Sequence, residues 1–114
     1  MPVVIAIDAG TTGVRSFALR DDGTPAGYAY REFTQHFPRP GWIEHDAEEI
    51  WAAVCATMAE ALANIDRPIA AVGLCTFWHS ILGVNAAGRP ASPIILWADT
   101  RSVEEVEALK ARLD

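Results

Sequence analysis

Residues 8–15, with the sequence DAGTTGVR, are the part of the chain best suited to hold a phosphate group. Small residues there let backbone N–H groups and hydroxyls face one anion at close range; they are Gly10, Thr11, Thr12 and Gly13. Asp8 precedes them and would hold a magnesium ion, because Mg²⁺ prefers one or two carboxylates together with phosphate oxygens. Arg15 could reach the outer phosphate. The alternative is a plain hairpin turn in which Asp8 is a capping acceptor, and the lack of a following Gly-Lys-Ser/Thr excludes a Walker A loop.

A second group of residues with chemical potential follows an apolar segment in the middle of the chain. Phe77, Trp78 and His79 come directly after residues 69–75, which we predict to be a buried strand. Open α/β sheets bind their ligands at the carboxyl ends of strands. A Trp-His pair can stack on the face of a sugar ring and exchange a hydrogen bond with a hydroxyl. In the alternative, Phe77 and Trp78 pack in the core and His79 is merely hydrogen-bonded.

The elements that must position these residues begin with three strands joined by tight turns. Residues 3–7 are continuously apolar and mostly β-branched, which is typical of a central strand covered on both faces, and this strand ends at Asp8. Residues 14–19 resume a strand pattern that is closed by the Asp-Asp-Gly turn signal at residues 21–23. Residues 26–33 alternate around aromatic side chains and form the third strand.

The clearest helix pattern follows residues 36–45, a loop that contains proline and glycine. Asp46 is suited to be the N-cap, with Glu49 three residues later. The apolar side of this helix is formed by Ile50, Val54, Met58, Leu62 and Ile65, supported by Trp51 and Cys55. Pro68 follows as a stop signal.

Short elements complete the pattern and define the fold class. We predict short strands at 81–84 and 93–97, a turn at 85–90, and a last helix from about Ser102. Glu105 completes a capping box at the start of that helix. The apolar side of the helix is formed by Val103, Val106, Leu109 and Leu113. A meander of antiparallel strands, a crossover helix and a further strand predict an α/β mixed sheet with flanking helices. This order is that of the opening of a ribonuclease H-like (actin-like ATPase) domain, of which the chain would hold the first part, although many other α/β folds begin in a similar order.

Composition and charge exclude several classes of protein. Of the 114 residues, 51% are hydrophobic and 21% charged, which excludes a disordered tail or a low-complexity linker. Fifteen acidic against nine basic residues give a net charge of −6, so we expect no nucleic-acid partner and no anionic membrane partner. No apolar run approaches the about 18 residues of a membrane span and no signal peptide is evident, so we expect a cytoplasmic protein. Cys55 and Cys75 are expected to be buried, reduced thiols.

Four segments together resemble the FGGY family of carbohydrate kinases, which includes glycerol kinase, xylulokinase and gluconokinase. They are Asp8-x-Gly10-Thr11-Thr12-x-x-Arg15 at the start of a hairpin, residues 40–46 (PGWIEHD), residues 73–75 (GLC) and residues 97–101 (WADTR). They match the family in order and approximate spacing across nearly the whole chain. The resemblance implies an ATP-dependent transfer of a phosphoryl group to a hydroxyl of a small sugar, sugar acid or polyol, with ATP and Mg²⁺ as cofactors.

The same resemblance implies a role for each matching residue of the first segment. Thr11, Thr12 and Arg15, together with Gly10 and Gly13, would contact the ATP phosphates, and Asp8 would lie at the magnesium. Gly13 stands where glycerol kinases often carry a serine, so a side-chain contact is lost there while the backbone N–H remains.

Four residues would contact the substrate by the same resemblance: Trp78, His79, Trp97 and Asp99. Trp78 and His79 align with a substrate-contacting pair that is Arg-Glu in glycerol kinases and Met-His in xylulokinases and gluconokinases. His79 fits the second pattern, whereas Trp78 fits neither. Trp97 resembles an aromatic residue that packs on substrate carbons, and its neighbours Asp99-Thr100-Arg101 look most like the gluconokinase and xylulokinase form. The expected substrate is therefore gluconate or xylulose.

The family's remaining machinery has no match in this sequence. In the family the catalytic base is an aspartate far downstream, and the adenosine site and second phosphate loop lie in a C-terminal domain. We therefore expect residues 1–114 to be a partial N-terminal kinase domain, without the catalytic base and inactive alone, whose full-length enzyme could form a homodimer. Two other hypotheses remain: a non-catalytic binding or interaction domain of the same fold, and a metal-dependent ribonuclease H-like hydrolase, which would need further carboxylates beside Asp8.

Overall fold

The computed structural model describes residues 1–113, which divide into two compact units. The first unit contains Met1–Thr34 and Asp46–Trp78, and the second contains residues 35–45 and 79–113. Asp114, the last residue of the predicted domain, lies outside the described residues. The first unit holds the main sheet with one helix, and the second holds a small strand pair and the last helix.

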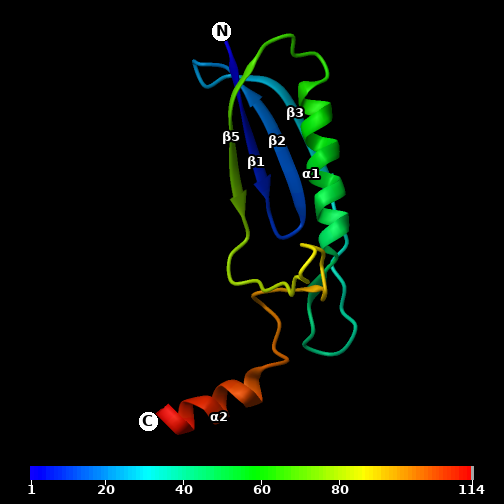
Figure 1. Ribbon diagram of the computed structural model, residues 1–114, viewed down its shortest axis with the longest axis vertical. Coiled ribbons are helices and arrows are strands. Elements are labelled where there is room, and N and C mark those ends of the chain that lie inside the picture. Colours follow the sequence, from blue (N-terminus) through cyan, green and yellow to red (C-terminus); the bar gives the residue numbers. More distant parts are fainter. Residues whose placement is uncertain (114) are drawn as a thin grey trace. The chain divides into compact units, whose positions relative to one another are not determined.

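Four strands form the sheet of the first unit in the order β3-β2-β1-β5 (Figure 1). They are β1 (Val3–Ala9), β2 (Gly13–Leu19), β3 (Pro25–Glu32) and β5 (Ile69–Thr76). The first three are a consecutive antiparallel meander, and β5 pairs parallel to β1 after a crossover through α1 (Ala47–Leu62). The mixed sheet predicted from the sequence is confirmed.

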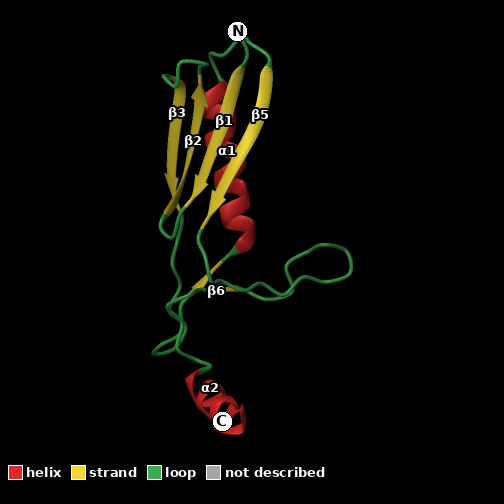
Figure 2. Cartoon of the chain, turned by 90° about the vertical axis from the view of Figure 1, so that its left-hand side faces the viewer, coloured by secondary structure: helices red, strands yellow, loops and turns green. Residues whose placement is uncertain are grey.

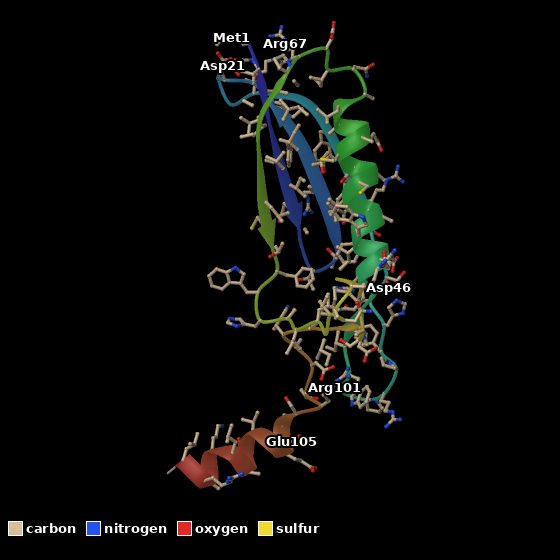
Figure 3. All side chains as sticks on the ribbon, in the orientation of Figure 1. Met1, Asp21, Asp46, Arg67, Arg101 and Glu105 are labelled. Atoms are coloured by element: carbon tan, nitrogen blue, oxygen red, sulfur yellow. The ribbon has the colours of Figure 1, made fainter. Side chains whose placement is uncertain are left out.

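Helix α1 begins where its sequence signals predict. The Asp46 carboxylate accepts hydrogen bonds from the backbone N–H groups of Glu48 (2.8 Å) and Glu49 (3.4 Å), and Figure 3 places Asp46 at the start of the helix. The Glu49 carboxylate accepts from the backbone N–H of Thr34 (2.9 Å), which joins the helix start to the segment after β3. The N-terminal end of α1 is therefore held both by its own cap and by the sheet.

One face of the sheet packs against α1, as Figure 2 shows. Its buried side chains come from alternate positions of β1 and β2: Val3, Ile5, Ile7, Ala9, Val14 and Ala18. The partly buried apolar residues that α1 and its C-terminal extension add are Ile50, Val54, Met58, Leu62 and Ile65. Ser16 and Thr57, both fully buried, share a hydrogen bond of 2.8 Å between β2 and α1. Because a buried hydroxyl without a partner is costly, this pair favours one register of the helix on the sheet.

The opposite face of the sheet is not covered by a helix within the described part of this unit. All eight residues of β5 are exposed, so the prediction of a buried strand there is wrong, as is the prediction that the first strand is covered on both faces. The reason is topological: β5 lies at the sheet edge, while α1 packs mainly against β2 and β3. Cys75 is exposed with its strand, and Cys55 and Trp51 lie exposed on α1, so the predictions that place these three side chains in the interior are wrong.

The second unit contains two short strands, β4 (Glu44–His45) and β6 (Ile94–Ile95), which pair antiparallel. The predicted strand at 93–97 is thus shorter than expected, and the one at 81–84 is reduced to isolated bridges. Asn85 forms the predicted turn, because its side-chain oxygen accepts from the backbone N–H groups of Ala87 (2.9 Å) and Arg89 (3.0 Å).

Helix α2 (Val103–Leu113) confirms the last predicted helix, but its four apolar side chains are all exposed. Neither helix of residues 1–113 combines the length and the hydropathy needed to cross a membrane.

Candidate active site

The predicted phosphate loop is a tight hairpin between β1 and β2. Ala9 pairs with Val14, and the N–H of Gly10 donates to the carbonyl of Gly13 (2.9 Å). The Gly10 amide therefore has a partner inside the turn. Thr11 and Thr12 lie at its tip, and their amides and hydroxyls are the phosphate donors that the sequence predicts. The alternative of a hairpin turn and the phosphate-loop prediction are thus compatible, because the same turn presents these groups.

Asp8 and Arg15 lie side by side at the base of this hairpin. They are direct neighbours across β1 and β2, on the face that α1 does not cover, and Arg15 Nη1 is 3.6 Å from Asp8 Oδ2. The side chains are 50% and 44% exposed, respectively. An exposed pair at this distance is weak, so both groups can exchange partners for a cation and a phosphate.

The residues around Asp8 fit a magnesium ion only if that ion is also bound to phosphate. No group of three His, Cys, Asp or Glu side chains suitable for a metal gathers within residues 1–113. An ion held by Asp8 would therefore complete its shell with phosphate oxygens and water, which is the usual coordination of Mg²⁺ at nucleotide sites.

Trp78 and His79 follow the carboxyl end of β5, as predicted. Trp78 closes the first unit and is 77% exposed, so the interpretation that it packs in the core is wrong. His79 opens the second unit and has a φ of 56°, the one positive φ of a non-glycine residue within the described chain. This conformation costs an L-residue about 1–2 kcal/mol, and such strain is found at ligand sites.

Trp97 stands at a tight turn directly after β6. The N–H of Asp99 donates to the carbonyl of Leu96 (3.0 Å), which closes the turn, and the indole is 59% exposed. An aromatic face presented in this way is available for apolar contact with a ligand.

Asp99 holds that turn to the segment before α1. Its carboxylate is only 2% exposed and accepts hydrogen bonds from the backbone N–H of Ile43 (2.7 Å) and from the backbone N–H, Nε and Nη2 of Arg101 (2.9, 2.9 and 2.8 Å). Arg101 also donates to Glu44 (2.7 Å), and its Cζ lies 3.8 Å from the ring centroid of Trp42. The role of Asp99 as a substrate ligand stays a prediction. A substrate hydroxyl that donated to its carboxylate would have to share an oxygen that already accepts hydrogen bonds.

Titration of Asp99 will make the second unit sensitive to acid. Hydrogen bonds from Arg101 hold the pKa of this carboxyl well below its ordinary 3.8, more than burial raises it. Because the pKa of Asp99 is lowered in the folded state, the contribution of its carboxylate to the free energy of unfolding is fully present above about pH 4. That contribution is lost as the pH falls through the folded-state pKa. We expect Asp99→Asn to destabilise the unit at pH 7 and to flatten this acid dependence, as measured by urea unfolding between pH 2 and 7. If Asp99→Asn had the same acid dependence as the wild type, the stabilising role of the Asp99 carboxylate would be contradicted.

The predicted site residues are divided between the two units. Asp8, Arg15 and the loop at 10–13 lie together in the first unit, which also contains Trp78. His79, Trp97 and Asp99 belong to the second unit.

Sequence reasoning missed that Arg101 binds both Asp99 and Glu44, because Arg101 and Glu44 are 57 positions apart in the sequence. The acidic residue and the arginine each lie inside a recognised motif, which is the one signal that could have paired them.

Comparison with known proteins identifies the family. The pattern of the FGGY family of carbohydrate kinases, N-terminal domain, matches residues 3–114. The chain therefore belongs to the FGGY family of carbohydrate kinases, and its ribonuclease H-like (actin-like ATPase) fold is that of the family.

Individual relatives agree with this assignment. A glycerol kinase of Trichormus variabilis is 42% identical over 108 residues, which cover 87% of this chain and 21% of that protein. The crystal structure of xylulose kinase from Rhodospirillum rubrum superimposes with a TM-score of 0.93 at 28% identity, over 98% of this chain and 24% of the other. The crystal structure of Plasmodium falciparum glycerol kinase with ADP superimposes with a TM-score of 0.88 at 26% identity, over 97% of this chain and 23% of the other. The chain spans about a fifth of the length of the curated relatives it matches.

Proposed function

We propose that this chain is the N-terminal part of an ATP-dependent carbohydrate kinase, which transfers the γ-phosphoryl group of MgATP to a hydroxyl of a small sugar, sugar acid or polyol. The observation that carries the proposal is the exposed pair of Asp8 and Arg15 at the base of a hairpin whose tip presents two threonines. Membership of the family supports it, as does the relative crystallised with ADP.

Each part of the loop has a distinct task in this proposal. Thr11 and Thr12 bind phosphate oxygens through their amides and hydroxyls, and Arg15 pairs with the outer phosphate. Asp8 would hold Mg²⁺, which when bound neutralises charge on the phosphates. Catalysis of this kind is mostly positioning and electrostatic stabilisation, so a rigid hairpin between two paired strands suits it.

The substrate that we propose is gluconate or xylulose. His79 and the WADTR segment at 97–101 support it, because both resemble the forms found in kinases of those substrates. Glycerol is the second candidate, since the glycerol kinase of Trichormus variabilis is 42% identical to this chain. The strained backbone at His79 and the exposed ring of Trp97 would suit contacts with hydroxyls and carbons, respectively.

A substrate panel on the full-length kinase tests the proposal. ATP-dependent phosphorylation of D-gluconate, D-xylulose and glycerol would be measured at equal concentrations, with GTP as an alternative donor. We expect gluconate or xylulose to react with a kcat/KM at least about tenfold above that of glycerol. Activity with glycerol alone would refute the substrate proposal and leave the kinase proposal intact, whereas phosphoryl transfer to none of the three would count against both.

The isolated chain is expected to be inactive. It contains no residue to which we assign the role of the base, and phosphoryl transfer to a hydroxyl usually needs one. Turnover by the 114-residue chain alone would contradict this part of the proposal.

A further inference from the structure

Tyr30 is the aromatic residue that supports Arg15 from the neighbouring strand. The two residues are direct partners across β2 and β3, as Asp8 and Arg15 are across β1 and β2. Asp8, Arg15 and Tyr30 therefore form one row across three strands, on the sheet face opposite α1. The Cζ atom of Arg15 lies 4.8 Å from the centroid of the Tyr30 ring, within the range of a cation–π interaction.

The Tyr30 ring also reaches toward the phosphate loop, over Gly13. A Cβ atom placed on Gly13 would lie 2.7 Å from Cε2 and 2.8 Å from Oη of Tyr30, as well as 2.6 Å from the carbonyl oxygen of Arg31. No side chain fits at position 13 in this arrangement, because both the β3 backbone and the ring are too close. The glycine and the tyrosine are thus complementary in size, and the ring is confined between the loop and the guanidinium.

The two partners of Arg15 differ in what they do when a nucleotide binds. Asp8 is a charged partner at 3.6 Å, and in the proposed function its carboxylate turns to a magnesium ion. The Tyr30 ring is uncharged, so it competes neither for the cation nor for the phosphate. A guanidinium that packs on an aromatic face keeps its N–H groups directed outward in its own plane, where they can bind phosphate oxygens in bidentate fashion.

We infer that Tyr30 is a positioning residue for nucleotide binding: its ring holds Arg15 toward the outer phosphate, and the missing side chain of Gly13 makes room for it. The inference rests on the proposed function, because it takes Arg15 to be a phosphate ligand. Tyr30 acts through Arg15 and is not itself a catalytic residue.

The test compares the binding of MgATP and MgADP to the full-length kinase by calorimetry. Tyr30→Leu removes the aromatic face and is expected to weaken MgATP about five- to tenfold while MgADP stays within about twofold, because the outer phosphate is the one affected. Tyr30→Phe keeps the ring and should bind both nucleotides like the wild type. Tyr28→Leu is the matched control: Tyr28 lies on the same face of β3 but packs on Phe17, with ring centroids 4.8 Å apart. It should change neither affinity.

Arg15→Ala separates the two levels of the proposal. In that background, Tyr30→Leu should have no further effect on MgATP. Unchanged MgATP affinity in Tyr30→Leu, an equal loss for both nucleotides, or a further loss in the Arg15→Ala background would overturn the role of Tyr30. Should Tyr30→Leu fail to fold, Tyr30→Gln removes the aromatic face in the same way and is judged by the same outcomes. If Arg15→Ala itself leaves MgATP affinity unchanged, the phosphate loop of the proposed function fails, and the role of Tyr30 with it.

Discussion

Replacement of Asp8 by asparagine, or of Thr11 by alanine, will remove most of the turnover of the full-length kinase. The asparagine keeps the shape of the side chain but loses the charge that would hold Mg²⁺, and the alanine loses a hydroxyl at the tip of the hairpin. Loss of one preorganised electrostatic group at a reacting centre typically costs about 10²- to 10³-fold in kcat. Steady-state kinetics with saturating MgATP and the preferred substrate would measure the effect.

Two control variants show whether such losses are local. Asp21→Asn makes the same chemical change in the exposed turn between β2 and β3, and it should leave kcat unchanged. Thr11→Ser restores a hydroxyl and should recover a large part of the activity that Thr11→Ala loses. Normal turnover in both Asp8→Asn and Thr11→Ala would show that the phosphate-loop assignment is wrong.

Gly27→Ala will strongly destabilise the first unit. Gly27 lies in β3 where α1 approaches the sheet so closely that a Cβ atom would overlap the carbonyl oxygen of Ala61 and lie 3.0 Å from its carbonyl carbon. Backbone atoms cannot rotate away, so the helix must shift and loosen its packing against β2 and β3. We expect a loss of about 2–3 kcal/mol in the free energy of unfolding, measured by urea denaturation followed by far-ultraviolet circular dichroism.

Gly73→Ala is the matched control for that change. Gly73 lies in β5 of the same sheet, and the nearest heavy atom to an added Cβ would be the carbonyl oxygen of Ile5 at 3.9 Å, which is ordinary contact. Because alanine also has less conformational freedom in the unfolded chain, this variant should be as stable as the wild type or slightly more so. Equal urea midpoints for the two variants would show that α1 does not approach β3 as described.

The elements that bear on the phosphate loop could be predicted from the sequence because their signals are local. The β-branched run at 3–7, the Asp-Asp-Gly turn at 21–23 and the capping signals at Asp46 each act over a few residues, and all three appear in the structure. The position of Asp8 at the start of a hairpin follows directly from two of these strands.

What the sequence could not reveal depends on which surfaces meet. An apolar strand such as residues 69–75 indicates that something can cover it, but its exposure is decided by its place at the sheet edge. Contacts distant in sequence were missed for the same reason: Ser16 with Thr57, and Arg101 with Glu44. The pairing of Arg15 with Tyr30 requires the β2–β3 register, which a hairpin turn alone does not define.

The two alternative hypotheses, a metal-dependent hydrolase and a non-catalytic binding domain, differ in how well they agree with the structure. A metal-dependent hydrolase would need further carboxylates converging on Asp8, and the described residues contain no such group. A non-catalytic binding domain would keep the fold and could keep the nucleotide site, so it differs from a kinase only in the full-length protein's ability to transfer a phosphoryl group.

A crystal structure of the full-length kinase with Mg²⁺ and a non-hydrolysable ATP analogue tests the central claim most directly. The expected result is that phosphate oxygens lie within hydrogen-bond distance of the Thr11 and Thr12 amides or hydroxyls, with Arg15 on the outer phosphate and the ion beside Asp8. Phosphates bound away from the β1–β2 hairpin, with Asp8 and Arg15 still paired to each other, would contradict it.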